Sequence, residues 1–393
     1  MSTAQATPYG SRAAALVLLM LPVALYLLVF VYPLTSIISL SVDNSGLSKR
    51  FQSLSSLGSD ASADQEAAAL LADFRAMDKK QLGEAARMLN QQRSGFRSLV
   101  MNTGKAADEI APTMAALVAF DDRWADRSYW DIINANAAGV TWKYYQRALG
   151  IKADTKSGAS AQAGDDMYLR VMGRTLTITF QVTILTLLIG YPLAYAAANG
   201  SPRVSTLVLA VVLLSFWTSV LVRTTAWVVL LQTNGLVNNI LVGLGLVSQP
   251  VQLIFNRFGA LLAMTHVLLP FAILPMLNVM RTIPASQSDA SRSLGAGRIE
   301  TFLRVYFPQS LRGVAVGGGT VFILSLGFYV TPALTGGPED QMLAWFIADF
   351  VNKTLNWGMA SALSVLLLGM VAFLVAVAGL ARWAAARQNR RDA

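Results

Sequence analysis

The sequence predicts an all-α, polytopic membrane protein, and three observations support this. Hydrophobic residues make up 54% of the 393 residues and charged residues 13%, whereas a soluble domain carries about 25% charged residues. The chain has no cysteine and one histidine, His266. This excludes disulfides and thiolate metal sites and leaves almost no material for a histidine-based metal site or catalytic triad. Six apolar runs are long enough to cross a bilayer, which takes about 20 helical residues.

The first of these runs raises the question of a signal peptide. It follows Arg12, and a short basic N-terminus before an apolar stretch is typical of such a peptide. Its length and the absence of a small-x-small cleavage site before Asp43 favour a helix that is retained. The six spans are predicted at 13–32, 175–198, 204–222 (extendable to about residue 231), 258–280, 314–334 and 358–380.

The distribution of basic residues predicts the orientation in the membrane. Short cytoplasmic loops carry an excess of Lys and Arg. With a cytoplasmic N-terminus, the loops on that side are strongly basic, whereas acidic and basic residues nearly balance between 43 and 166. We therefore expect a multi-pass membrane protein with both termini in the cytoplasm. The basic residues on the inner side are Arg12, Arg203, Arg281, Arg292, Arg298, Arg304, Arg312, Arg382, Arg387, Arg390 and Arg391.

The spans divide the chain into three predicted parts. Residues 1–42 hold the cytoplasmic N-terminus and helix 1, residues 43–168 form an extracytoplasmic insertion, and residues 169–393 hold helices 2–6. The insertion is predicted to be helical, because Ser62 and Gln65 form a capping-box pattern and apolar residues follow at helical spacing. It is either a small capping domain whose aromatic residues form its own core, or a docking surface for a soluble partner. These aromatic residues are Trp124, Tyr129, Trp130, Trp142, Tyr144 and Tyr145.

The cytoplasmic loop between helices 4 and 5, residues 281–313, predicts two short helices that meet at a glycine. The first begins near Pro284 and ends at Gly295, a residue suited to a left-handed C-terminal cap. The second is expected to end at Pro308, because proline cannot continue a hydrogen-bonded helix. Its predicted apolar face has the i, i+3, i+4, i+7 spacing of a helix and consists of Ile299, Phe302, Leu303 and Tyr306.

This loop resembles the signature E-A-A-x3-G-x9-I-x-L-P of the permease subunits of binding-protein-dependent ABC importers. All the spacings agree. Four identities depart conservatively from it, with Asp for Glu, Ser for Ala, Val for Ile and Phe for Leu. The resemblance implies the type I ABC importer permease fold, a location in the bacterial inner membrane, and a loop that sits in a groove of a cytoplasmic ATPase. The implied ATPase-coupling residues are Asp289, Ala290, Ser291, Leu294, Gly295, Val305, Phe307 and Pro308.

The resemblance also implies partners. They are a cytoplasmic ABC ATPase dimer, a second permease subunit in a hetero- or homodimer, a periplasmic substrate-binding protein and the lipid bilayer, but no nucleic acid. The chain itself has no Walker A sequence G-x-x-x-x-G-K-[ST], so we expect the partner subunit to bind ATP. It also lacks a G-x-S-x-G elbow and an H-E-x-x-H pair, so we expect no enzymatic activity, cofactor or metal in this chain.

Further motifs resemble one branch, the spermidine/putrescine permeases. These are G-Y-P-L-A-Y at 190–195, S-F-W-T-S at 215–219, L-V-R-T-T-A-W at 221–227 and Y-V-T-P at 329–332. They imply a polyamine as the transported solute. The insertion has no counterpart in the short polyamine permeases, so opines, amino-acid derivatives, phosphonates and ferric ions remain alternatives.

Six residues are candidates for the translocation path. An ionisable residue within a membrane span is a candidate functional residue, although a lone histidine such as His266 also forms hydrogen bonds between helices. Glu339, Asp340 and Asp349 on the outer side would suit a polyamine, or are ordinary loop charges. A secondary transporter is a further alternative, but neither inverted repeats nor charged residues near the midplane are found. The candidates are Trp217, Arg223, Trp227, His266, Tyr329 and Asp349.

Overall fold

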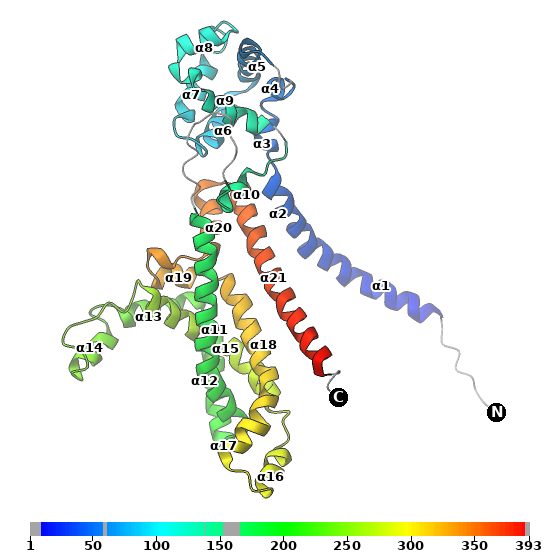
Figure 1. Ribbon diagram of the computed structural model, residues 1–393, viewed down its shortest axis with the longest axis vertical. Coiled ribbons are helices and arrows are strands. Elements are labelled where there is room, and N and C mark those ends of the chain that lie inside the picture. Colours follow the sequence, from blue (N-terminus) through cyan, green and yellow to red (C-terminus); the bar gives the residue numbers. More distant parts are fainter. Residues whose placement is uncertain (1–8, 58–60, 138, 152–165, 390–393) are drawn as a thin grey trace. The chain divides into compact units, whose positions relative to one another are not determined.

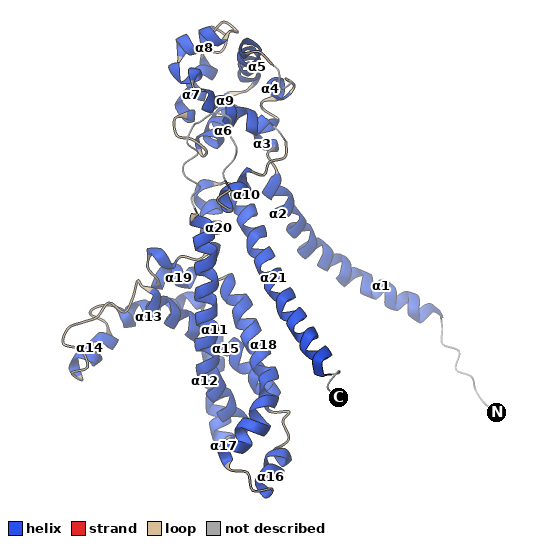
Figure 2. Ribbon diagram, viewed as in Figure 1, coloured by secondary structure: helices blue, strands red, loops and turns tan. Residues whose placement is uncertain are grey.

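The computed structural model describes residues 9–57, 61–137, 139–151 and 166–389 (Figures 1 and 2). These residues contain no strand, and their extended pairing is a single bridge between Asp43 and Val140. The predicted all-α fold is confirmed. Arg390 and Arg391, which the orientation argument used, lie outside the described residues.

The chain forms two compact units. The first comprises residues 1–166 with 353–368, and the second comprises residues 167–352 with 369–393. The last helix, α21 (Trp357–Asn389), contributes to both. The predicted domain limits at residues 43 and 169 stay a prediction.

The first unit begins with a long helical stretch made of α1 (Tyr9–Tyr26), the π-helical turn η1 (Leu27–Val31) and α2 (Tyr32–Val42). Within it, Leu18–Val42 is 25 residues long and apolar, and its most apolar window is 0% buried inside the protein. Pro33 lies in the first turn of α2, directly after the π-helical turn, and has no N–H to donate to the preceding turn. The exposed apolar surface is that of a helix surrounded by lipid or by another protein.

The insertion is a small helical domain with its own core. The predicted capping box is present, since the Ser62 hydroxyl accepts a hydrogen bond from the Gln65 N–H and the Gln65 side chain accepts one from the Ser62 N–H. The buried residues include Leu70, Phe74 and Leu89, which the helical spacing places on the inner faces. Its elements are α3 (Ser45–Ser48), α4 (Gln52–Ser55), α5 (Ala63–Ala76), α6 (Lys79–Asn90), α7 (Phe96–Lys105), α8 (Met114–Phe120), η2 (Asp122–Ala125), α9 (Arg127–Ala137) and α10 (Lys143–Ala148).

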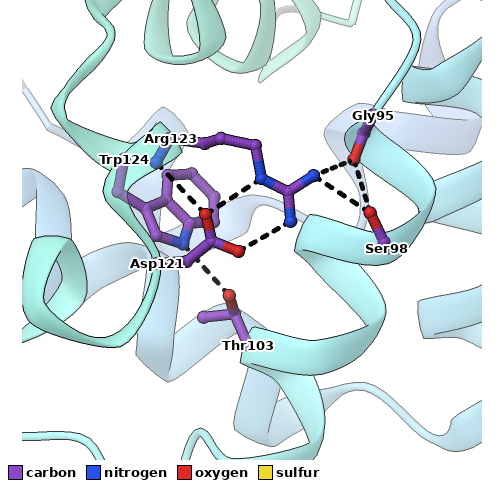
Figure 3. Close-up of polar contacts among 6 residues, drawn as sticks. All are labelled: Gly95, Ser98, Thr103, Asp121, Arg123 and Trp124. Atoms are coloured by element: carbon purple, nitrogen blue, oxygen red, sulfur yellow. Dashed lines mark hydrogen bonds and ion pairs between the residues drawn. The ribbon is translucent and has the colours of Figure 1, made fainter.

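Six residues in and beside this core form paired polar contacts (Figure 3). The indole N–H of Trp124 donates to the hydroxyl of Thr103 over 3.0 Å. The guanidinium of Arg123 donates to both carboxylate oxygens of Asp121, at 2.9 and 2.6 Å, and to the carbonyl of Gly95. The hydrogen bond from Arg123 lowers the pKa of Asp121, so this carboxylate stays charged at neutral pH.

The predicted aromatic core of the insertion is only half right. Trp124, Tyr129 and Trp130 are buried in it, and the two indole rings lie 5.3 Å apart. Trp142, by contrast, is exposed, and it precedes the short helix α10. Aromatic composition alone therefore does not distinguish a buried core residue from an exposed one.

The second unit is built on three long helices, α11 (Met167–Asn199), α15 (Arg257–Met280) and α18 (Phe307–Leu326). Gly313 and Gly317 of α18 bring its backbone against α15, as small residues do at helix interfaces in membranes. The remaining elements are α12 (Pro202–Trp217), α13 (Val220–Leu231), α14 (Leu236–Gly243), α16 (Ala285–Ser293), α17 (Arg298–Thr301), η3 (Phe302–Tyr306), α19 (Val330–Thr335), η4 (Pro338–Asp340), α20 (Leu343–Asp349) and η5 (Phe350–Thr354).

Two predicted spans are not single helices. The span at 204–222 is divided between α12 and α13, because Thr218 is extended (ψ 138°) and its hydroxyl donates back to the carbonyl of Leu214. The helix in the predicted span at 314–334 begins earlier, at Phe307, and ends at Leu326, and a separate helix, α19, begins at Val330. Pro308 therefore does not end a helix, contrary to prediction. It lies in the first turn of α18, after the π-helical turn η3.

Within the described residues, five helical stretches are long and apolar enough to cross a membrane, and one of them, Val220–Gly243, comprises α13 and α14 with a break between them. They are Leu18–Val42, Met167–Asn199, Val220–Gly243, Arg257–Met280 and Trp357–Leu380. The apolar helix Pro202–Trp217 is shorter, and α18 is not among the five. The predicted number of six spans stays a prediction.

Candidate functional site

The loop at 281–313 contains the glycine turn that the sequence predicts. Gly295 has φ +92°, in the left-handed region. Its N–H donates to the carbonyl of Arg292 over 2.9 Å, and the N–H of Ala296 donates to the carbonyl of Ser291 over 3.2 Å. These two bonds are the Schellman pattern, which satisfies the last carbonyls of α16 and reverses the chain.

Side-chain hydrogen bonds join the two arms of this turn. The hydroxyls of Ser291 and Thr301 lie 3.2 Å apart, and Thr301 is buried between the arms. The amide of Gln309, on α18, donates to the side-chain oxygen of Gln287, on α16, over 2.6 Å. The loop is therefore a folded unit attached to the start of α18.

The loop exposes apolar side chains. Leu294 is 90% exposed, Ile299 is 76% exposed, and Leu303 is exposed on the same short segment. None of the residues of α16 is buried, including Asp289 and Ala290. Isolated exposed apolar residues are ordinary, but several on one loop indicate a surface for another protein.

The predicted apolar face of the second short helix is divided. Ile299 and Leu303 are exposed, whereas Tyr306 is buried and Phe302 is partly buried. The reason is the π-helical turn at 302–306, since its wider turn changes the angular spacing that an α-helix would impose.

The buried half connects the loop to α11. The amide of Asn199 donates to the hydroxyl of Tyr306 over 2.6 Å, and the hydroxyls of Tyr191 and Ser310 lie 2.8 Å apart. Burial raises the pKa of Tyr306, so this hydroxyl stays neutral. No sequence pattern predicts this connection, although the motif G-Y-P-L-A-Y at 190–195 contains Tyr191. The rings in contact are Tyr191, Tyr195, Phe302, Tyr306 and Phe307.

Three of the six translocation-path candidates lie together. The indole N–H of Trp227 donates to Nδ1 of His266 over 3.1 Å, and their rings meet edge to face. Arg223 is buried, and its guanidinium donates to the carbonyl of Val267, the next residue after His266, over 3.3 Å. The Nε atom of Arg223 is buried without a hydrogen-bond partner. The cluster is polar, and the charge that it carries is positive.

The other three candidates are placed differently. Trp217 is the exposed last residue of α12, and Tyr329 precedes α19. In the described part of the chain, neither forms a hydrogen bond to Arg223, Trp227 or His266. Asp349 is the last residue of α20.

The carboxylate of Asp340, which is predicted to lie on the outer side, is paired. Arg257, at the start of α15, donates to it over 2.6 Å, and the N–H of Gly337 donates to its other oxygen over 3.0 Å. Arg174 of α11 donates to the carbonyl of Glu339 over 2.5 Å. Asp340 therefore joins the turn at 336–340 to the long helices, a role that its position in a loop sequence did not indicate.

The described residues contain no group of three or more His, Cys, Asp or Glu side chains that could hold a metal ion. The carboxylates named above are engaged with guanidinium groups or lie apart from one another.

Comparison with known proteins identifies the family. The family described as "Binding-protein-dependent transport system inner membrane component" matches residues 187–391. The spermidine/putrescine transport system permease protein PotB of Haemophilus influenzae is 30% identical over 211 residues, covering 54% of this chain and 74% of that protein. PotB of Escherichia coli is 27% identical over 203 residues, covering 52% and 74%.

A crystal structure of a bacterial ABC transporter that imports the acidic polysaccharide alginate overlaps at a TM-score of 0.43 with 17% identity, covering 59% of this chain and 81% of that one. The family match extends from α11 to α21 and thus includes the 281–313 loop and the cluster around Arg223. The chain belongs to the family of binding-protein-dependent transport system inner membrane components, and it is a multi-pass inner-membrane permease of an ABC importer.

Proposed function

We propose that this chain is a transmembrane subunit of an ATP-driven importer that moves a polyamine, or a similar small organic compound, into the cytoplasm. A cytoplasmic ATPase dimer binds the ATP, a second permease subunit completes the path, and a periplasmic binding protein delivers the solute. Both termini face the cytoplasm. The chain itself carries no catalytic residue and no cofactor.

The observation that carries this proposal is the 281–313 loop. Its Schellman turn presents Leu294 and Ile299 to solvent although both are apolar. Full burial of such a side chain contributes about 1.5–3 kcal/mol, so a partner that covers both gains appreciable affinity. In this family the expected partner is a cytoplasmic ATPase, whose groove would cover these side chains.

The contacts between the loop and α11 support a role in coupling. Movement of an ATPase seated on the loop would reach the membrane helices through Tyr306, which bonds to Asn199, and through Ser310, which bonds to Tyr191. The packed rings around them transmit displacement because a close-packed cluster deforms little.

The similarity to PotB supports a polyamine as the solute. The positive charge of Arg223 would repel a polyamine, and Asp340 is neutralised by Arg257. We therefore assign selection of the solute chiefly to the binding protein. Opines, amino-acid derivatives, phosphonates and ferric ions are the alternative solutes, and calorimetry of the binding protein with each of them and with spermidine distinguishes these possibilities.

The test of the coupling loop uses two glycines of the same turn. Gly295 has φ +92°, whereas Gly297 has φ −68°, and a Cβ atom at either position would meet no atom within 4 Å. Gly295→Val should therefore distort the turn, because a non-glycine residue in left-handed backbone costs about 1–2 kcal/mol. Gly297→Ala is the matched control.

We expect Gly295→Val to insert into the membrane but to retain less ATPase on co-purification and to show less solute-stimulated ATP hydrolysis. Gly297→Ala should remain close to the unsubstituted protein. Asp289→Arg should weaken ATPase association by reversing a charge on the exposed helix α16. Normal assembly and transport by Gly295→Val would contradict the proposed coupling role.

A further inference from the structure

The segment 139–151 is tied to the outer end of the first membrane-spanning helix. The N–H of Thr141 donates to the carbonyl of Val42, the last residue of α2, over 2.8 Å. The N–H of Asn44 donates to the carbonyl of Gly139 over 3.0 Å. The hydroxyl of Tyr145 donates to that of Ser41 over 2.7 Å. These bonds fix the segment at the level where α2 ends.

The same segment meets the beginning of α21, which is also part of the first unit. The ring of Tyr144 lies directly on the backbone at Gly358, where an added Cβ atom would fall 2.3 Å from it. Trp357, an exposed tryptophan, is the first residue of α21. Segment 139–151 thus contacts the ends of two apolar helices (Figure 1).

The lengths of these helices set the depth of the segment. Leu18–Val42 has 25 residues and Trp357–Leu380 has 24. At 1.5 Å per residue they span about 36–38 Å, which exceeds the roughly 30 Å of the hydrocarbon core. Helices of this length are expected to end in the headgroup region, so we place Val42 and Trp357, with segment 139–151 beside them, at that level.

Three of the four exposed side chains of this segment are apolar, and the fourth is Arg147. Val140 and Trp142 are each 63% exposed, and Ile151 is 56% exposed. Among the described residues from 43 to 137, Phe120 is the one large hydrophobic residue that is exposed, at 43%. The exposed apolar surface of the insertion is thus concentrated next to the membrane helices instead of being spread over the domain.

The two basic side chains of the segment are placed differently from each other. Nζ of Lys143 points inward, where it donates to Oδ1 of Asn44 over 2.8 Å and to Oδ1 of Asn136. Arg147 is exposed together with Trp142. Tryptophan with neighbouring aliphatic and arginine side chains is the composition found at membrane–water interfaces, where the indole ring is apolar and its N–H reaches water.

We propose that segment 139–151 is an interfacial anchor, in which Val140, Trp142 and Ile151 enter the headgroup region of the bilayer and hold the insertion at a fixed height above the membrane. The occupant of this surface is lipid. The assignment does not depend on the transported solute or on ATPase coupling.

The absence of cysteine makes a depth measurement direct. Single-cysteine variants Val140→Cys and Trp142→Cys are labelled with an environment-sensitive fluorophore in the full chain, assembled with its partners in vesicles of phosphatidylethanolamine and phosphatidylglycerol. The vesicles contain a lipid with a nitroxide quencher at the headgroup, at a shallow acyl carbon or at a deep acyl carbon. Phe120→Cys is the matched control, because it also replaces an exposed apolar residue of the insertion.

We expect strong quenching at 140 and 142 by the headgroup and shallow quenchers, weaker quenching by the deep one, and none at 120. Quenching at 140 and 142 as weak as at 120 would overturn the anchor. So would strong quenching at 142 that disappears when the binding protein is added, because the surface would then dock a protein. Transport activity is not measured, so failure of the proposed function does not affect this result.

Discussion

At the scale of single residues, the structure explains stability by the pairing of buried polar groups. The core of the insertion contains indole, hydroxyl and guanidinium groups, and those drawn in Figure 3 have partners within hydrogen-bond distance. A buried donor that loses its partner costs more free energy than the bond itself contributes. Single substitutions at such pairs are therefore sensitive tests of the geometry.

Thr103→Val removes the acceptor of the buried Trp124 indole N–H while nearly keeping the side-chain volume. We expect the free energy of unfolding of the insertion to fall by about 1–3 kcal/mol, the cost of an unsatisfied buried donor. The measurement is urea unfolding of the detergent-solubilised chain followed by tryptophan fluorescence. Ser98→Ala is the control. It removes a hydroxyl that accepts from Arg123, but Arg123 keeps its hydrogen bonds to Gly95 and Asp121, so no buried donor is left without a partner. Equal losses for both variants would argue against the buried pair.

Lys143 gives a pH dependence of known sign. Burial lowers its pKa from 10.5 to about 8. Between these two values the unfolded chain holds the proton and the folded chain has released it, so the free energy of unfolding contributed by this group rises with pH. Lys143→Met should remove that rise. The comparison is made from pH 8 to below 10, where Tyr144, whose pKa is raised by burial, remains protonated. Parallel pH profiles for the two proteins would show that Lys143 is not buried as described.

At the scale of elements, the sequence predicts the backbone conformation correctly at positions where glycine or a capping residue determines it. It does not predict the conformation where packing between helices determines it. The turn at Gly295 and the capping box at Ser62 were readable, because each needs a particular residue type at a particular spacing. The break at Thr218 was not, because it interrupts an apolar run without proline or glycine. Nor was the π-helical turn at 302–306, whose wider spacing separates Ile299 from Tyr306.

The interface between α15 and α18 predicts a contrast between two glycines of one helix. A Cβ atom at Gly317 would lie 2.8 Å from the carbonyl oxygen of Ala272, whereas one at Gly319 would meet nothing within 4 Å. Gly317→Ala should force the two helices apart, at a cost of about 1–3 kcal/mol. Gly319→Ala should be neutral or stabilising by up to about 1 kcal/mol, since alanine favours helix. Thermal unfolding in detergent compares them, and equal shifts in Tm would be evidence against this packing.

At the scale of the whole molecule, composition and motif were enough to predict the membrane class and the family, because both depend on long runs and fixed spacings. The candidate path residues were harder to predict. Arg223, Trp227 and His266 come together, but the pairing of Asp340 with Arg257 follows from chain positions 83 residues apart and no local pattern indicates it.

The orientation in the membrane is tested by reporter fusions. Fusions after Arg203, within 292–297 and after Arg387 should report a cytoplasmic location, because arginine-rich short loops stay inside. Fusions within 62–153 should report the periplasm. A cytoplasmic signal from the insertion would reverse the orientation of every span.

ATP-driven import is tested by uptake of labelled spermidine into vesicles that contain the assembled importer, with and without its ATPase. We expect uptake that requires the binding protein outside and ATP with the ATPase inside, and that is lost when the ATPase is omitted. Uptake that persists without the ATPase and follows an ion gradient would contradict it, and the chain would then act as a secondary carrier.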